Sequence, residues 1–155
     1  MKKAVLVFVI LAIGITTQAQ QLQLQKNSHP KVSKANMKNN PLLQTWDTPY
    51  QTPPFDLIKE EHYIPAFNAA IEMAQKEIDE IANNPQKPDF QNTIVALERS
   101  GLKLKRIESI FFNMLSCNTT PNLQKMAEKL SPILSNFSNS IYHNEKLEKK
   151  KDLHN

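Results

Sequence analysis

The chain has 155 residues and a formal net charge of +4, and it contains one cysteine and two glycines. A single cysteine excludes an internal disulfide framework. Two glycines are too few to build a glycine-rich loop for phosphates or dinucleotides. Much of the positive charge lies in polar runs near the two ends, without interleaved aromatic residues, so the sequence does not indicate nucleic-acid binding.

Residues 1–19 have the pattern of a secretory signal peptide. Lys2 and Lys3 precede an apolar run at 4–15, and small residues follow up to Ala19. A membrane anchor is the alternative, but about 20 apolar residues are needed to cross a bilayer. We therefore expect cleavage after Ala19, a periplasmic or secreted protein, and no membrane association after cleavage.

The next section divides into a polar leader and a proline-rich strap. Residues 20–39 are rich in Gln, Lys, Asn and Ser, which predicts a flexible leader. Prolines then alternate with Trp46, Tyr50 and Phe55. Because proline fixes φ and lacks an amide donor, this run predicts an extended strap laid over a helical surface and anchored by its aromatic side chains. A proline-rich ligand for another domain is the alternative, although no Pro-x-x-Pro repeat persists.

Hydrophobic periodicity predicts a first long helix from Glu60 or Pro65 to Ala82. Proline is compatible with the first turn of such a helix, and Asn83-Asn84-Pro85 is expected to end it. Its apolar stripe consists of Phe67, Ala70, Ile71, Ala74, Ile78 and Ile81.

A second stripe follows and stays in phase across Gly101. It consists of Phe90, Ile94, Leu97, Leu104, Ile107, Phe111 and Met114. The phase favours one continuous helix from about Asn92 to Ser116, in which the glycine costs about 1 kcal/mol and permits close approach of a neighbouring helix. A helix end at Ser100-Gly101 is the alternative. Cys117, at the end of this pattern, is predicted to be a small buried side chain rather than a reactive thiol.

A third helix is predicted to begin with Thr120 as its cap and Pro121 at its first position. Pro132 lies inside it and predicts a kink. Residues 148–155 are expected to form a divergent basic tail in solvent. The fold class is therefore all-α, with about three long antiparallel helices. The third stripe consists of Leu123, Met126, Ala127, Leu130, Ile133, Leu134, Phe137 and Ile141.

Residue patterns that carry chemistry are missing from the sequence. A zinc peptidase helix needs two histidines four residues apart with a glutamate between them, and no His-Glu-x-x-His occurs in these 155 residues. Acidic residues such as Glu77, Asp79 and Glu80 are typical of a solvated helix face. We therefore predict no catalytic, cofactor-binding or metal-binding residue and no cofactor in this chain. The four histidines are His29, His62, His143 and His154.

Six short motifs nevertheless occur, once each, in a characteristic order within residues 40–147. They are Asn40-Pro41-Leu42, Pro53-Pro54-Phe55, His62-Tyr63-Ile64-Pro65-Ala66, Phe90-Gln91-Asn92-Thr93, Ala96-Leu97-Glu98 and Ser100-Gly101. Their order and spacing resemble the amino-terminal region of zinc peptidases of the thimet-oligopeptidase family, and within it the bacterial peptidyl-dipeptidases.

That resemblance implies a role in peptide hydrolysis. Members of the family are large helical proteins with two lobes around a deep channel, and they act on short peptides with a zinc ion bound by a later segment. The resemblance implies that residues 40–147 belong to one wall of that channel. Because the catalytic motif is missing, we expect a truncated product that is inactive alone. A stand-alone secreted helical binding module is the alternative function.

Overall fold

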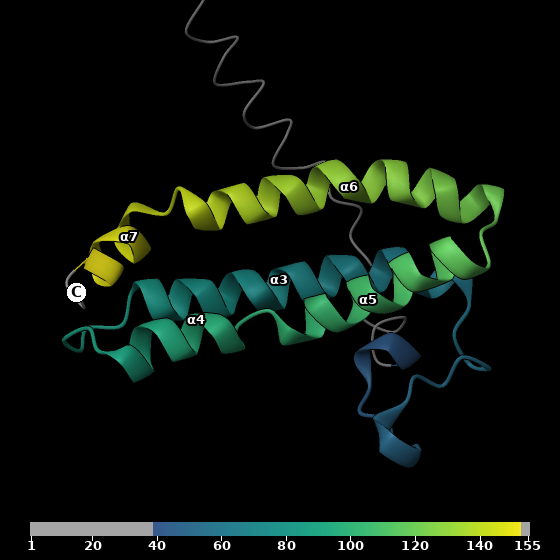
Figure 1. Ribbon diagram of the computed structural model, residues 1–155, viewed down its shortest axis with the longest axis horizontal. Coiled ribbons are helices and arrows are strands. Elements are labelled where there is room, and N and C mark those ends of the chain that lie inside the picture. The colour runs from purple at the N-terminus through teal and green to yellow at the C-terminus, as the bar shows by residue number, and fades with distance from the viewer. Residues whose placement is uncertain (1–38, 153–155) are drawn as a thin grey trace, which may run out of the picture. The chain divides into compact units, whose positions relative to one another are not determined.

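The structure is a computed structural model that describes residues 39–152. All regular elements in this range are helices, and the range contains no β-strand (Figure 1). The predicted all-α class is therefore confirmed. The predicted signal peptide at 1–19, and the leader except for its last residue, lie outside the described residues. None of the described helices is long and apolar enough to span a bilayer.

The proline-rich section is built from short turns rather than from a continuous extended strap. Its regular elements are the 3₁₀ turns η1 (Pro41–Leu43), η2 (Pro49–Gln51) and η3 (Glu60–His62). Trp46 is buried as predicted, but Tyr50 is 100% exposed and Phe55 is 52% exposed, so the expected burial of all three aromatics is wrong. The section is held to the helices mainly by its first residues, and the turns around η2 are closed by local bonds such as Gln51 N–H to the Thr48 carbonyl.

The first long helix, α3 (Tyr63–Ala82), matches its prediction. Pro65 lies in its first turn, where a missing amide leaves no helical bond unmade. The Asn83 amide donates to the Asp79 carbonyl at 3.0 Å and closes the last turn. Most of the predicted stripe is buried, namely Phe67, Ala70, Ala74 and Ile78.

The predicted continuous second helix is wrong, because the chain breaks at Ser100 and Gly101. Ser100 is extended, with φ −72° and ψ 150°, and Gly101 is left-handed, with φ 66°. The break separates α4 (Ala96–Arg99), which follows the π-helical turn η4 (Phe90–Val95), from α5 (Leu102–Cys117). The alternative helix end at Ser100-Gly101 is therefore the correct one.

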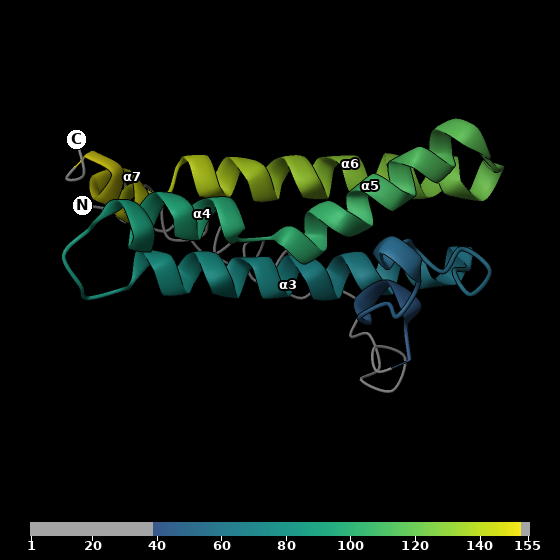
Figure 2. The same ribbon diagram turned by 60° about the horizontal axis from the view of Figure 1, so that its bottom comes forward.

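The physical reason lies in the contacts that Gly101 makes with α3. Its amide donates to Glu77 Oε2 at 2.7 Å, and a Cβ built on it would lie 3.6 Å from the Cβ of Ala74. The backbone therefore approaches α3 as closely as the sequence suggested, but as a turn. Leu97 and Leu104 still share a side of the chain because α4 and α5 both run along α3 (Figure 2).

The core lies mainly between α3 and α5, which pack side by side. The Phe111 ring meets the rings of Tyr63 and Phe67 edge to face, with centroids 5.1 and 5.5 Å apart. Such pairs add to the stabilisation from apolar burial. The buried cluster consists of Leu42, Leu43, Trp46, Tyr63, Ala66, Phe67, Ala69, Ala70, Ala74, Leu104, Ile107, Ile110, Phe111, Leu123 and Leu130.

The predicted third helix is α6 (Pro121–Tyr142), and its start is confirmed. The Leu123 amide donates to Thr120 Oγ1 at 3.1 Å, so Thr120 caps the helix, with Pro121 at its first position. The helix continues through Pro132, and the kink expected there stays a prediction. Of the predicted stripe, Leu123 and Leu130 are buried, while the remaining residues are partly or fully exposed.

The expected burial of Cys117 is wrong, whereas the divergent basic tail at 148–155 stays a prediction. Most of the expected solvated tail belongs to α7 (Glu145–Asp152), whose Leu147 is buried against Ile78 and Ala82. Lys150 Nζ donates to the Asn84 carbonyl at 2.7 Å, which explains why this basic run is ordered. Cys117 is exposed, because it is the last residue of α5 and lies beyond the buried face of that helix.

Candidate functional site

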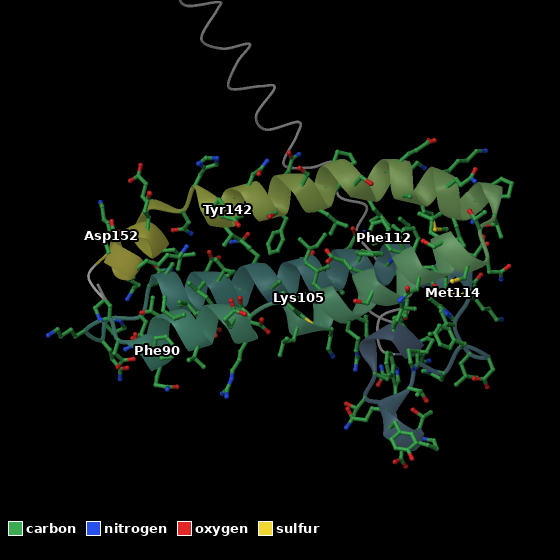
Figure 3. The ribbon with its side chains drawn as sticks, in the orientation of Figure 1. Phe90, Lys105, Phe112, Met114, Tyr142 and Asp152 are labelled. Carbon is green, nitrogen blue, oxygen red and sulfur yellow. The ribbon has the colours of Figure 1, made fainter. Side chains whose placement is uncertain are left out.

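A concave surface formed by described residues lies between α6 and the α4–α5 pair. It is a cleft of about 450 Å³, which we call the α6 groove. Its floor is formed by Ala74 and Ile78 of α3. Figure 3 shows Lys105 on α5 and Tyr142 at the end of α6, which belong to opposite walls. The apolar wall residues are Leu97, Leu104, Leu134, Phe137 and Ile141.

The α6 groove lies beside the second half of α6, whereas the first half of the helix enters the main core through Leu123 and Leu130. At the start of α6, Glu60 of η3 accepts hydrogen bonds from Thr120 Oγ1 and Asn122 Nδ2, both at 2.6 Å. These bonds hold the pKa of Glu60 below its usual range, with the Thr120 bond the larger cause. Beyond the other end, Leu147 of α7 is buried, whereas no α6 residue after Leu130 is buried.

One half-buried carboxylate lies in the groove. Burial raises the pKa of Glu108, and the charge of Lys105 partly opposes this shift. Within the described part of the chain, Glu108 has no hydrogen-bond donor. A desolvated acid without a donor is unfavourable, so a ligand that supplies an N–H or a cation would gain from meeting it. Glu98 and Lys151 are the other charged residues of the lining.

A smaller and more open cleft, of about 340 Å³, lies beside Gly101. Its acidic residue Glu77 already accepts the Gly101 amide, and Asn92 takes part in capping η4. These side chains therefore have structural roles. The lining consists of Glu77, Glu80, Ile81, Asn84, Asn92, Ala96, Arg99 and Ser100.

Sequence reasoning missed the residues that attach the proline-rich section to α5. The Arg106 guanidinium lies 4.0 Å from the centre of the Trp46 ring and donates to the Gln44 carbonyl at 2.9 Å. Burial lowers the pKa of Arg106. Lys103 Nζ donates to the Leu43 carbonyl at 2.8 Å. A tryptophan upstream of basic residues three apart is too weak a signal to predict this contact.

The histidines within the described residues have local roles. His62 Nδ1 accepts the Lys59 amide at 3.0 Å, and its carbonyl accepts Asn40 Nδ2 at 2.8 Å. His143 is exposed at the end of α6. His29 and His154 lie outside the described residues. Residues 39–152 contain no group of three acidic, histidine or cysteine side chains that could hold a metal ion, and the predicted lack of site residues stays a prediction.

Comparison with known proteins gives a clear relationship. The chain is 46% identical over 111 residues to a dipeptidyl carboxypeptidase of Salmonella typhimurium, which covers 72% of this chain and 16% of that protein. It is 45% identical over 108 residues to a dipeptidyl carboxypeptidase of Escherichia coli, and this match covers 70% of this chain and 16% of that protein. Oligopeptidase A of Escherichia coli is 29% identical over 110 residues, and this match covers 71% of this chain and 16% of that protein. No protein-family model matches the chain.

These matches cover most of this chain but only a small part of each relative. The chain spans about one sixth of the length of the curated relatives it matches. Identity of 45–46% over more than a hundred residues is shared with two dipeptidyl carboxypeptidases. We conclude that this chain is a segment belonging to the family of the dipeptidyl carboxypeptidases and oligopeptidases A.

Proposed function

We propose that residues 40–147 form part of the channel wall of a secreted zinc peptidyl-dipeptidase, and that the 155-residue chain has no peptidase activity by itself. The observation that carries this proposal is the 45–46% identity to dipeptidyl carboxypeptidases in a sequence without a His-Glu-x-x-His motif. Short peptides would be the substrates of the complete enzyme, and the apolar run at 4–15 supports export.

The proposal includes no zinc site in this segment, and two observations support that part of it. His62 Nδ1 is occupied by the Lys59 amide, and the described residues bring no three suitable ligands together. A catalytic zinc site needs three protein ligands and an open position. We therefore assign no step of hydrolysis to these residues. The contribution that we propose for them is to form part of the channel wall.

The packing of α3, α5 and the proline-rich section is consistent with a role as part of a channel wall. The α3–α5 pair shares an aromatic core, and Arg106 fastens the proline-rich section across α5. Helices packed in this way keep their spacing, because a close-packed interior resists deformation. A wall of this kind would limit the channel to short, unfolded peptides.

A segment replacement tests the proposal. In the dipeptidyl carboxypeptidase of Escherichia coli, the matching segment is replaced by residues 40–147 of this chain, and release of dipeptides is measured. We expect a folded, active chimera with a rate within roughly tenfold of the parent, which is about 1.4 kcal/mol in the barrier. A matched chimera carrying Phe111→Asp should fail to fold and lose activity. A chimera that folds but releases no dipeptides would refute the proposal.

One observation favours the alternative, a stand-alone helical binding module. The core around Phe67 and Phe111 is continuous within this segment and includes the proline-rich section through Trp46. A module of this kind would unfold cooperatively, with an enthalpy appropriate to its size. Calorimetry of the isolated chain measures this directly. A broad, non-cooperative transition would exclude the alternative.

A further inference from the structure

The second half of α6 lines the α6 groove with apolar side chains that pack against the core of this segment but are only partly covered by it. Leu134, Phe137 and Ile141 line the α6 groove and remain partly exposed, and Tyr142 is 76% exposed. On the facing wall, Leu97 is only partly buried. Apolar surface concentrated in a concavity is typical of an interaction site.

Two acidic residues, Glu98 and Glu108, and two basic residues, Lys105 and Lys151, line the groove, and of these Glu108 narrows the choice of occupant. Glu108 is half-buried and has no hydrogen-bond donor within residues 39–152, although the charge of Lys105 acts on it. An occupant that places a lysine or arginine over Glu108 would replace the water that the carboxylate has lost. The groove therefore favours an apolar partner with a basic residue among its contacting side chains.

The size and surroundings of the groove favour a helix. Its volume of about 450 Å³ holds several side chains rather than a whole helix, so the partner would lie over the mouth. Residues 39–152 contain no sheet edge to which an extended strand could add. An amphipathic helix instead inserts side chains at i, i+3, i+4 and i+7 into such a groove.

We propose that the α6 groove is the docking site for an amphipathic helix that carries a basic residue on its apolar face and comes from the part of the peptidase polypeptide that this chain does not match. The inference rests on the proposed function. The source of the helix follows from the comparisons, because about five sixths of each dipeptidyl carboxypeptidase lies outside the matched segment.

Association in trans tests the proposal. The full chain is titrated with the dipeptidyl carboxypeptidase of Escherichia coli from which the matching segment has been deleted. We expect saturable binding that weakens by roughly tenfold or more for Glu108→Lys, a charge reversal in the groove, and for Phe137→Ala. The control Glu128→Lys makes the same reversal on exposed α6 surface outside the groove and should leave the affinity within about twofold.

Equal affinities for Glu108→Lys and Glu128→Lys would overturn the inference, as would a folded wild-type chain that does not bind. The one-chain chimera gives a second readout that does not depend on the folding of the deleted partner. There, Glu108→Lys should lower the melting temperature, and Glu128→Lys should not. An active chimera indifferent to Glu108→Lys would remove the groove inference and leave the proposed function intact, whereas a folded, inactive chimera would remove the proposed function.

Discussion

Substitution of Gly101 by alanine distinguishes the observed break from a continuous helix by the sign of its effect. Gly101 has φ 66°, and an L-residue in this left-handed region costs roughly 1–2 kcal/mol. The added Cβ would meet the Ala74 Cβ at 3.6 Å, an ordinary van der Waals distance, so crowding adds little. We therefore expect Gly101→Ala to lower the free energy of unfolding by about 1–2 kcal/mol.

A continuous helix would give the opposite result. Alanine in a helix interior is about 1 kcal/mol more favourable than glycine, so the same substitution would then stabilise the protein. Thermal unfolding of the two chains, followed by far-ultraviolet circular dichroism, measures the sign. A decrease of about 4 °C or more corresponds to the expected loss.

Asparagine at the same position provides the matched control. Asparagine visits the left-handed region more readily than alanine does, so Gly101→Asn should destabilise the chain less than Gly101→Ala. A higher melting temperature for Gly101→Ala than for the parent, or equal losses for the two variants, would refute the left-handed conformation assigned to Gly101.

Three further predictions concern the core, the start of α6 and the attachment of the proline-rich section. Phe111→Ala should cost about 3–5 kcal/mol in urea unfolding, because the ring is fully buried, whereas Phe112→Ala, at a ring 38% exposed, should cost about 1 kcal/mol or less; similar costs would contradict the described core. The pKa of Glu60 is lowered in the folded chain, so its stabilisation is present above the unfolded pKa and is lost as the pH falls through the folded value. The stability difference between wild type and Glu60→Gln should therefore be present at neutral pH and vanish in acid, and a difference independent of pH would contradict the role of this carboxylate. Arg106→Lys should destabilise the chain by about 1 kcal/mol and shift Trp46 fluorescence to longer wavelength as water reaches the ring, and an unchanged spectrum would argue against the stacked contact.

The parts of the fold that depend on local chemistry could be predicted from the sequence. Thr120 followed by proline marks a helix start because the hydroxyl can accept an amide that lacks a helical partner. The stripe of α3 predicts its buried face because a helix repeats every 3.6 residues. These signals need no knowledge of distant partners, and both are confirmed.

The wrong predictions concern places where contacts between distant residues determine the local conformation or the burial of a side chain. The stripe of the second pattern stays in phase across Gly101, so periodicity alone could not reveal a break that is stabilised by Glu77 on another helix. Tyr50 and Phe55 are aromatic residues of the type that often anchors a segment by burial. Of the three aromatics, only Trp46 stacks against the Arg106 guanidinium. The basic run at 148–151 does not by itself predict the helix α7, whose Leu147 is buried against Ile78 and Ala82.

The groove could be predicted only in part. The α6 stripe indicates an apolar face, but whether that face is covered depends on how far α6 stands from α3 and α5. That spacing follows from the Glu60 contacts at one end and from α7 at the other. Neither contact has a signature in the sequence, because each joins residues 60 or more positions apart.

The proposed lack of activity is tested most directly by asking whether this chain by itself can bind zinc and cleave a peptide. The purified chain is equilibrated with zinc at neutral pH and dialysed, and its bound metal and its release of dipeptides from a short peptide are measured. We expect neither retained zinc nor release of dipeptides. Stoichiometric zinc together with dipeptide release that a chelator abolishes would contradict this expectation.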